Sequence, residues 1–275
     1  MTDSTTVRQT AASRLFRRLH GDGLLVLANA WDAGSARLIE SLGARAIATT
    51  SAGVAWSHGY ADGDFLPVRL LAATVEDIAR VVNVPITVDV EGGYSSEPDA
   101  VGECVAQAIE AGAVGINIED GSGDPTLLCA KIEQAKSAGV RLGVDLFVNA
   151  RTDVYLRNLV QADRRVDETL ARAERYRAAG ADGIFVPGVA DSAEIRTIAS
   201  AVQLPLNVLA WPGLPPGPAL VALGVRRLSA GSALSKAVFG STASLAAAFL
   251  ASEDSGPLTA GGMTYADINA LMATS

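Results

Sequence analysis

The sequence predicts a single α/β domain folded as a (β/α)₈ TIM barrel, and three observations point to this fold. The chain has 275 residues, close to the roughly 250 of one such barrel. Hydrophobic residues make up 49% of it and charged residues 19%, which supplies enough apolar side chain for a large core. A motif that joins a helix to a strand recurs along the chain. We therefore expect residues 1–275 to form one barrel domain, with residues 235–275 as a C-terminal helical extension.

The recurring motif is a helical stretch that ends in glycine and is followed within one to three residues by β-forming side chains. Its glycines are Gly43, Gly112, Gly180 and Gly224. Glycine is favoured just past the C-terminus of a helix because it adopts the left-handed conformation without a Cβ clash. The copies together predict βα units in series.

Eight short runs have the composition of buried parallel strands. Most are apolar on both faces and are separated by helical patterns such as residues 101–111, 169–179 and 193–201. Eight units favour a closed barrel over an open doubly wound sheet, and no glycine-rich dinucleotide fingerprint follows the first strand. The expected strands are 24–29, 46–51, 86–91, 115–119, 143–150, 183–186, 206–210 and 227–230.

Helical patterns also flank the expected barrel. Residues 5–20 have apolar side chains at helical spacing and predict a first helix that covers the barrel. After the eighth strand, an Ala-rich helix over 235–250 and a short helix over 264–272 flank a polar connection. This tail is a candidate for packing on another subunit.

Composition and charge exclude two classes of partner. The net charge is −8, whereas nucleic acid or an anionic membrane would need a basic face. No uninterrupted apolar run reaches the roughly 18–20 residues that span a bilayer. The two cysteines, Cys104 and Cys129, are too few for a disulfide framework in a chain this long. We expect a cytoplasmic protein.

Acidic residues gather where the third and fourth expected strands end. Asp89 and Glu91 would point to the same side of the third strand, and Glu119 ends the fourth. The C-terminal ends of barrel strands form the active site. Carboxylates that converge there repel one another unless a cation lies between them, and hard oxygen ligands suit Mg²⁺ or Mn²⁺. Alternatively, these acids cap the following helices or pair with arginine.

Arg151 ends the fifth expected strand and brings a guanidinium to the same rim. Beside a divalent cation it can bind a substrate carboxylate through two hydrogen bonds; otherwise it only neutralises the acids. The small residues Ser51, Ala52 and Gly53 follow the second strand, where backbone N–H groups can approach an anionic oxygen.

Five groups of residues occur in this order along the chain and together resemble the isocitrate lyase and phosphoenolpyruvate mutase superfamily. The resemblance runs from about residue 10 to residue 235, and its most specific part lies at the third, fourth and fifth strands. The matching segments are Asn29-Ala30-Trp31-Asp32 with Ser35-Ala36-Arg37, Thr50-Ser51-Ala52-Gly53, Val88-Asp89-Val90-Glu91-Gly92-Gly93-Tyr94, Ile118-Glu119-Asp120 and Asn149-Ala150-Arg151-Thr152-Asp153.

The resemblance implies a barrel enzyme that holds Mg²⁺ through Asp89 and Glu119, directly or through water. It also implies that a pyruvyl-like substrate lies with its flat face against Trp31. The candidate catalytic residues are Asp62, Glu91 and Arg151, and the candidate substrate-binding residues are Trp31, Ser51, Ala52, Gly53, Asp89 and Arg151. The resemblance further implies dimers or tetramers in which neighbouring barrels exchange a C-terminal helix.

The sequence also departs from this superfamily. Lyases of the superfamily carry a Lys-Lys/Arg-Cys-Gly-His motif after the fourth strand; here the stretch 120–129 is short and lacks it, and Cys129 has the position of a core residue. The mutase branch uses a lid lysine, yet no lysine occurs between residues 1 and 130. Glu91 stands where the superfamily usually has Asp, and Gly92 where it usually has Thr.

These features favour an enzyme that cleaves a C–C bond of a 2-oxo acid resembling oxaloacetate or 2-oxoglutarate, through an enolate that Mg²⁺ stabilises. Oxaloacetate decarboxylation needs little beyond a metal and an anion-binding group. A phosphonate or phosphoenolpyruvate-type mutase or hydrolase is the alternative reaction. A 2-oxo acid binding protein with little catalysis is the alternative from another class.

Overall fold

The computed structural model describes residues 4–252, 254–259 and 261–273, in which nine strand segments form one parallel sheet. The sheet order is β1-β9-β8-β7-β6-β5-β4-β3-β2. Because only Ala28 separates β1 from β2 in the chain, both edges of the sheet belong to one segment and the ring of strands is nearly closed. The segments are β1 (Leu25–Leu27), β2 (Asn29–Ala30), β3 (Ile47–Thr49), β4 (Ile86–Asp89), β5 (Gly115–Glu119), β6 (Phe147–Arg151), β7 (Gly183–Val186), β8 (Leu206–Leu209) and β9 (Val225–Ser229).

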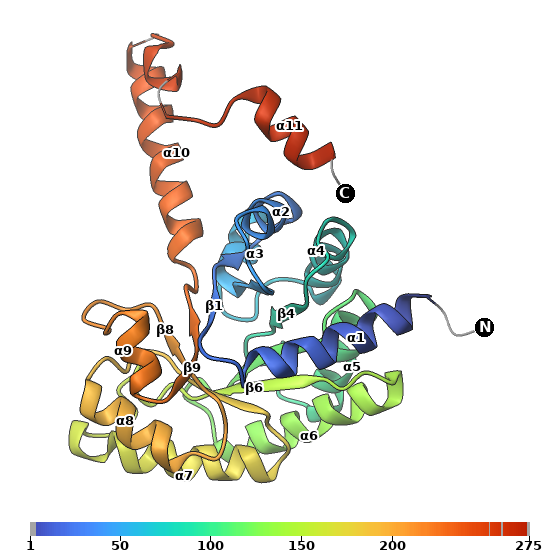
Figure 1. Cartoon of the computed structure of the whole chain (residues 1–275), viewed down its shortest axis with the longest axis vertical. Helices are drawn as coiled ribbons and strands as arrows, with labels where there is room; N and C mark the ends of the chain where they lie inside the picture. The colour runs from blue at the N-terminus through green and yellow to red at the C-terminus, as the bar shows by residue number, and fades with distance from the viewer. Residues whose placement is uncertain (1–3, 253, 260, 274–275) are drawn as a thin grey trace.

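Helices surround this ring, so the predicted TIM-barrel fold is confirmed (Figure 1). Gly43, Gly112, Gly180 and Gly224 all have positive φ, between 93° and 115°, as the recurring motif predicted. The helices are α1 (Ser4–Leu19), α2 (Ala33–Ser41), α3 (Ser51–Ser57), α4 (Val68–Val81), α5 (Pro98–Glu110), α6 (Pro125–Leu142), α7 (Arg165–Ala178), α8 (Ser192–Ala201), α9 (Gly217–Ala222), α10 (Ala233–Ser252) and α11 (Tyr265–Ala273), with short 3₁₀ turns η1 (Ala162–Arg164) and η2 (Gly256–Thr259).

Several expected strand boundaries were wrong, and three of the differences affect how the site is built. The first strand is broken at Ala28 into β1 and β2, which pair with different neighbours. The strand expected from residue 143 begins only at Phe147, because Gly143 caps α6 in the left-handed conformation with φ 71°. The strand expected to reach Glu91 ends at Asp89, because Glu91 itself has φ 51°. Strand alternation therefore does not decide where the Glu91 side chain points.

The amino end of the barrel is closed by aromatic packing beneath α1. Phe16 is fully buried and contacts Phe147 edge-on, at 5.4 Å between ring centroids. His20 stacks on Phe147 at 4.1 Å, and its Nδ1 donates to the Phe16 carbonyl at 2.9 Å. A Cβ on Gly115 would lie 2.7 Å from the Phe16 ring, so this strand position needs glycine. The helix that was predicted to cover the barrel, α1, therefore closes its amino end as a plug.

The middle of the barrel is polar and contains a fully buried guanidinium. Arg227 on β9 donates to Ser229 Oγ and to Asn117 Oδ1, each at 3.2 Å. Asn117 also accepts from Asn149 Nδ2 at 2.9 Å and lies in register with Asp89 on the neighbouring strand. Burial lowers the pKa of Arg227 to about 9, so the side chain remains charged at neutral pH. A fixed positive charge therefore lies inside the barrel.

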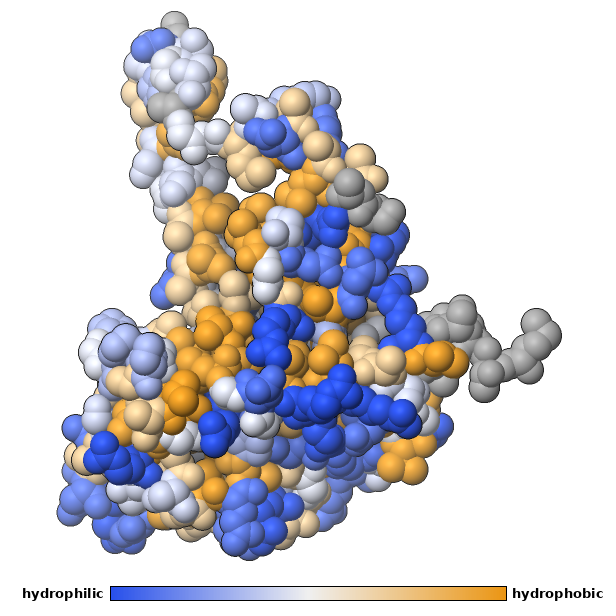
Figure 2. Space-filling view, viewed as in Figure 1, coloured by the Kyte–Doolittle hydropathy of each residue, from blue (hydrophilic) through white to orange (hydrophobic). Residues whose placement is uncertain are grey.

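The C-terminal helices form an arm that projects from the barrel (Figure 1). Hydrophobic residues run along the lower half of α10 in Figure 2, where Val238 and Phe239 are about half exposed and Phe239 contacts Trp56. The arm folds back at α11, where Arg37 Nε donates to the Leu271 carbonyl at 3.1 Å. The expected helical extension is thus present, beginning at Ala233.

One helix in the described ranges, α10, is long and apolar enough to cross a membrane by length and composition alone. Its mean hydropathy reaches 1.4 although serine, threonine, lysine and glycine interrupt its apolar residues. No uninterrupted run of apolar residues is long enough to span a bilayer, as expected. The hydropathy averaged over α10 nevertheless reaches the level of a membrane-spanning helix. An exposed apolar helix of this kind needs a covering surface.

Candidate active site

Three charged side chains meet at the carboxyl ends of adjacent strands. Asp89 ends β4, Glu119 ends β5 and Arg151 ends β6, with Glu119 and Arg151 in register. Arg151 Nη1 lies 2.5 Å from Glu119 Oε2. Asp89 Oδ2 accepts from the Ser51 backbone N–H at 3.3 Å, which ties β4 to the start of α3. The structure thus brings together the residues that the sequence placed on this rim.

Burial controls the charge of Glu119. Desolvation raises its pKa to about 8, the Arg151 guanidinium opposes this shift, and the Asp89 carboxylate adds to it. Burial also works against the charge of Arg151, but Glu119 and Asp153 raise the pKa of Arg151 above its ordinary value. The carboxylates of Glu119, Asp153 and Asp89 thus lie around the Arg151 guanidinium.

Arg151 is held by Asp153 through two hydrogen bonds. Its Nε donates to Asp153 Oδ1 at 2.7 Å and its Nη2 to Oδ2 at 3.0 Å. Because each terminal nitrogen carries two hydrogens, Nη1 and Nη2 each keep one for another acceptor. The edge formed by Nη1 and Nη2 is therefore the one that can bind a substrate carboxylate, and Asp153 fixes its direction.

A second buried carboxylate supports Asp153. Asp120 Oδ1 accepts from the Asp153 backbone N–H at 2.9 Å, and its Oδ2 accepts from Arg172 at 2.8 Å and from the Tyr176 hydroxyl at 2.6 Å. Asp120 therefore pairs with arginine, which was the alternative interpretation of the acids after the fourth strand. Its role is to anchor the segment that carries Arg151.

Glu91 lies against the loop that joins α3 to α4. Its Oε2 accepts from the backbone N–H groups of Gly63, at 2.8 Å, and of Asp64, and its Oε1 accepts from the Tyr94 hydroxyl at 2.9 Å. Burial raises the pKa of Glu91, while the Asp64 amide and Tyr94 oppose that shift. Both oxygens are thus engaged by the protein, and Glu91 fixes the loop that carries Asp62.

Asp62 lies at the mouth of the site. Desolvation first, and then the neighbouring Asp89 carboxylate, raise its pKa, whereas a hydrogen bond with the Ser51 side chain lowers it. The structure therefore places Asp62 beside Asp89, where the resemblance implied it.

Ser51, Ala52 and Gly53 form the first turn of α3. The second strand was expected to reach Ser51, but β3 ends at Thr49. N–H groups in a first turn have no partner within their own helix. A Cβ on Gly53 would lie 2.8 Å from the Trp31 side chain and 2.8 Å from Thr50, so glycine lets Trp31 pack against this turn. Trp31 and the three small residues thus line the same part of the rim.

The carboxylates fit a magnesium ion that retains water. Among the described residues, no group of three or more His, Cys, Asp or Glu side chains is arranged to hold a metal. Mg²⁺ is usually bound by one or two carboxylates together with waters and substrate oxygens. Asp89 and Glu119 supply two carboxylates at the ends of adjacent strands, and both lie close to the Arg151 guanidinium.

Sequence reasoning assigned no role to Asp153, Arg157 or Arg172. Asp153 stands in the quoted fifth-strand motif, and Arg157 follows it at the i, i+4 spacing of a local ion pair. That spacing was an available signal. Nothing in the sequence indicated that Arg172, on α7, would reach back to Asp120.

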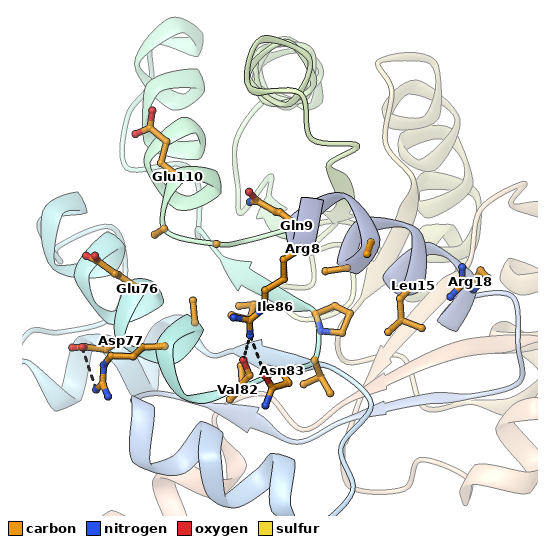
Figure 3. Close-up of a pocket in the computed structure, with 18 residues that line it drawn as sticks. Arg8, Gln9, Leu15, Arg18, Glu76, Asp77, Val82, Asn83, Ile86 and Glu110 are labelled. Atoms are coloured by element: carbon orange, nitrogen blue, oxygen red, sulfur yellow. Dashed lines mark hydrogen bonds and ion pairs between the residues drawn. The ribbon is translucent and has the colours of Figure 1, made fainter. Parts of the chain in front are cut away.

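A large cavity lies at the other end of the barrel. It has a volume of about 790 Å³ between α1 and the ends of α4 and α5 (Figure 3). Leu15 and Ile86 line it, and Arg8 at its edge donates to the Val82 carbonyl at 2.6 Å. Ile86 begins β4, so this cavity opens at the amino ends of the strands, away from Asp89.

A parallel barrel with acids and an arginine on the carboxyl ends of adjacent strands agrees with the isocitrate lyase and phosphoenolpyruvate mutase class of enzyme. The chain belongs to the phosphoenolpyruvate phosphomutase family, whose model matches residues 16–250. Members of this superfamily are lyases and mutases, and the chain is an enzyme of the same superfamily.

Individual relatives agree with this assignment. An oxaloacetate decarboxylase of Paraburkholderia xenovorans (strain LB400) is 32% identical, over 82% of this chain and 76% of the relative. An uncharacterised protein of Mycobacterium tuberculosis (strain H37Rv) is 40% identical, over 79% and 81%. A crystal structure from Burkholderia cenocepacia J2315, provisionally named as a lyase/mutase, superimposes with a TM-score of 0.87, at 34% identity over 97% of both chains.

Proposed function

We propose that the chain cleaves a C–C bond of a small 2-oxo acid in a Mg²⁺-dependent reaction, with oxaloacetate decarboxylation as the leading candidate. The observation that carries the proposal is the group Asp89, Glu119 and Arg151 at the ends of adjacent strands, in which the mostly buried Glu119 carboxylate lies 2.5 Å from the Arg151 guanidinium. The 32% identity to an oxaloacetate decarboxylase supports the same reaction.

The chain would bind metal and substrate side by side. Mg²⁺ held by Asp89 and Glu119 would supply Lewis-acid polarisation of the 2-oxo group and of the adjacent carboxylate. Arg151 would bind that carboxylate through Nη1 and Nη2, with Asp153 fixing its direction. The first turn of α3 and Trp31 would close the site from the opposite side.

Decarboxylation is favoured over lysis of a larger hydroxy acid because no thiol acid or base reaches the rim from the expected position. Cys129 lies on α6, where burial raises the pKa of its thiol. The alternative phosphonate chemistry is supported by a Burkholderia cenocepacia J2315 structure provisionally named as a phosphonomutase, 40% identical with a TM-score of 0.81. Binding of a 2-oxo acid without turnover remains the alternative from another class.

A ligand panel tests this proposal. Thermal unfolding of the metal-stripped protein would be measured with oxaloacetate, 2-oxoglutarate, pyruvate and phosphonopyruvate, with and without Mg²⁺. We expect stabilisation by 2-oxo acids only when Mg²⁺ is present, because ligands that bind the folded state raise its stability. Pyruvate release from oxaloacetate above the rate with Mg²⁺ alone would establish decarboxylation. Equal stabilisation with and without Mg²⁺ would contradict the metal site.

We also propose that a second copy of the chain covers the arm. Val238, Phe239 and Phe249 on α10 are between 41% and 49% exposed, which leaves an apolar face without a partner in one chain. Phe249→Asp should shift the chain from an oligomer to a monomer in light scattering. Arg226→Asp, a charge change on β9 outside the arm, serves as the control. A parent that is monomeric at micromolar concentration would contradict this part of the proposal.

A further inference from the structure

A second arginine lies beside Arg151 at the mouth of the site. Arg157, on the loop after β6, donates from Nε to Asp153 Oδ2 at 2.8 Å, and its backbone N–H donates to the Asp153 carbonyl at 2.9 Å. The turn and the ion pair fix both the backbone and the start of the guanidinium. Arg157 is thus held in place without being buried.

The two guanidinium groups share one carboxylate oxygen. Arg151 Nη2 lies 3.0 Å from Asp153 Oδ2 and Arg157 Nε lies 2.8 Å from it, so these nitrogens cannot be more than about 6 Å apart. The Arg151 side chain is 17% exposed and that of Arg157 is 49% exposed. One fully buried acid, Asp153, therefore presents a deep cation and a shallow cation next to each other.

The outer end of Arg157 has unused hydrogen-bond donors. Among the described residues, neither Nη1 nor Nη2 has a hydrogen bond or ion pair. Nη2 lies 4.0 Å from where a Cβ on Gly121 would be, so the side chain reaches across to the loop that follows Glu119.

We propose that Arg157 binds a second anionic group of the substrate, and that the enzyme therefore prefers 2-oxo dicarboxylates to 2-oxo monocarboxylates of the same chain length. This inference rests on the proposed function and names the substrate class within it. Arg151 binds the carboxylate beside the 2-oxo group, and Arg157 binds the carboxylate at the other end. The loop 120–124 between β5 and α6 is short, and the Arg157 guanidinium lies beside it.

The effect should be moderate. A charge-assisted hydrogen bond is worth more than a neutral one, but a half-exposed guanidinium loses part of that advantage to solvent screening. We expect a dicarboxylate to bind about tenfold more tightly than its matched monocarboxylate, which lies at the low end for a charge-assisted contact.

Matched ligand pairs test the inference. Calorimetric titrations in saturating Mg²⁺ would compare 2-oxoglutarate with 2-oxovalerate, which have the same carbon chain and differ only in the second carboxylate. Parent, Arg157→Gln and Arg164→Gln would be measured. Arg164 is an exposed arginine on the neighbouring turn η1 and controls for the loss of one positive charge. Arg157→Gln should remove the tenfold preference by weakening 2-oxoglutarate binding more than 2-oxovalerate binding, while Arg164→Gln keeps the preference.

Each other outcome is decisive. If Arg157→Gln weakens both ligands equally, Arg157 acts only by supporting Asp153 and Arg151, and the inference is wrong. If phosphonopyruvate depends on Arg157 and 2-oxoglutarate does not, the second group is a phosphonate and the dicarboxylate assignment is overturned. If the parent binds both members of the pair equally, this inference fails alone. If the parent binds no 2-oxo acid, the proposed function fails as well.

Discussion

The two ends of this barrel are built from the same nine strand segments, yet they differ in what they bury. The carboxyl end buries charge: Asp153 and Asp120 are completely hidden acids that hold arginines. The amino end buries aromatic rings beneath α1 and leaves a cavity of about 790 Å³. Cavity volume would therefore favour the amino end as a site, whereas buried charge favours the carboxyl end. Buried charge that needs a partner is the better indicator of chemistry.

Arg227 lies between these two ends and connects them electrostatically. Among the described residues Arg227 forms no salt bridge, and its guanidinium donates hydrogen bonds to Ser229 and Asn117. Its charge helps lower the pKa of His20 at the amino end, and Asp89 at the carboxyl end stabilises it in turn. The buried charge of Arg227 thus interacts with Asp89 at the carboxyl end and with His20 at the amino end.

The largest expected effect concerns the metal. Asp89→Ala should abolish Mg²⁺-dependent binding of a 2-oxo acid, because it removes one of the two carboxylates proposed to hold the ion. Asp77→Ala is the matched control, since Asp77 lines the amino-end cavity and is 65% exposed. Titration with Mg²⁺, and circular dichroism to confirm folding, would measure both variants. If Asp77→Ala removed Mg²⁺-dependent binding and Asp89→Ala did not, the two ends would have been assigned the wrong way round.

The next effect concerns the guanidinium. Arg151→Lys should weaken 2-oxo acid binding by roughly ten- to hundred-fold despite keeping the charge, because an ammonium cannot donate to Asp153 and to a substrate carboxylate in fixed directions. The affinity for Mg²⁺ should fall far less. Arg18→Lys, beside the amino-end cavity, should change neither. Calorimetry of ligand and of metal on both variants decides it: unchanged ligand affinity in Arg151→Lys would reduce Arg151 to neutralising Glu119.

The contrast between the ends also explains how far sequence reasoning could reach. The positions of Asp89, Glu119 and Arg151 follow from regular strands, so the parallel order and the register bring them together as expected. Glu91 lies beyond the last strand residue, and its left-handed backbone and its bonds to the 63–64 amides depend on a loop distant in sequence. The alternation of side chains along a strand therefore cannot predict where the Glu91 side chain lies.

The same limit applies to the residues that support the site. The Arg172–Asp120 pair joins residues 52 positions apart, and no local spacing indicates such a contact. The Asp153–Arg157 pair is local and could have been recognised. What the sequence could not show is that Asp153 also holds Arg151, because that depends on how the chain turns after β6.

A smaller effect is expected at the amino end, where His20 should make stability depend on pH. Burial, with a contribution from Arg227, lowers the pKa of folded His20 to about 3, below the 6.5 of the unfolded chain. The unfolded state therefore binds more protons below pH 6.5, so the free energy of unfolding falls as pH decreases from 6.5 towards 3. His20→Gln should reduce that slope by up to about 1.4 kcal/mol per pH unit.

Unfolding of parent and variant at pH 7.5, 6.0 and 5.0 would measure the slope. His20→Gln should leave 2-oxo acid binding at pH 7.5 unchanged, because the plug lies at the opposite end from Asp89. Identical slopes in the two proteins would mean that His20 is protonated in the folded chain and that the amino-end plug is more open than its packing indicates.

The smallest effect is expected for the thiol on α6. Cys129→Ser should leave Mg²⁺-dependent 2-oxo acid binding and any turnover of oxaloacetate within about twofold of the parent, because a half-buried thiol whose pKa is raised by burial is poorly suited to proton transfer at neutral pH. Cys104→Ser is the comparison: Cys104 is buried, burial raises its pKa to about 12, and introducing a hydroxyl there should cost about 1–3 kcal/mol of stability without changing ligand affinity. Both variants would be measured by thermal unfolding and by the pyruvate-release assay. A loss of three or more orders of magnitude in Cys129→Ser with the fold intact would show that α6 supplies an acid or base to the carboxyl end, and lysis of a larger hydroxy acid would then replace decarboxylation as the leading reaction.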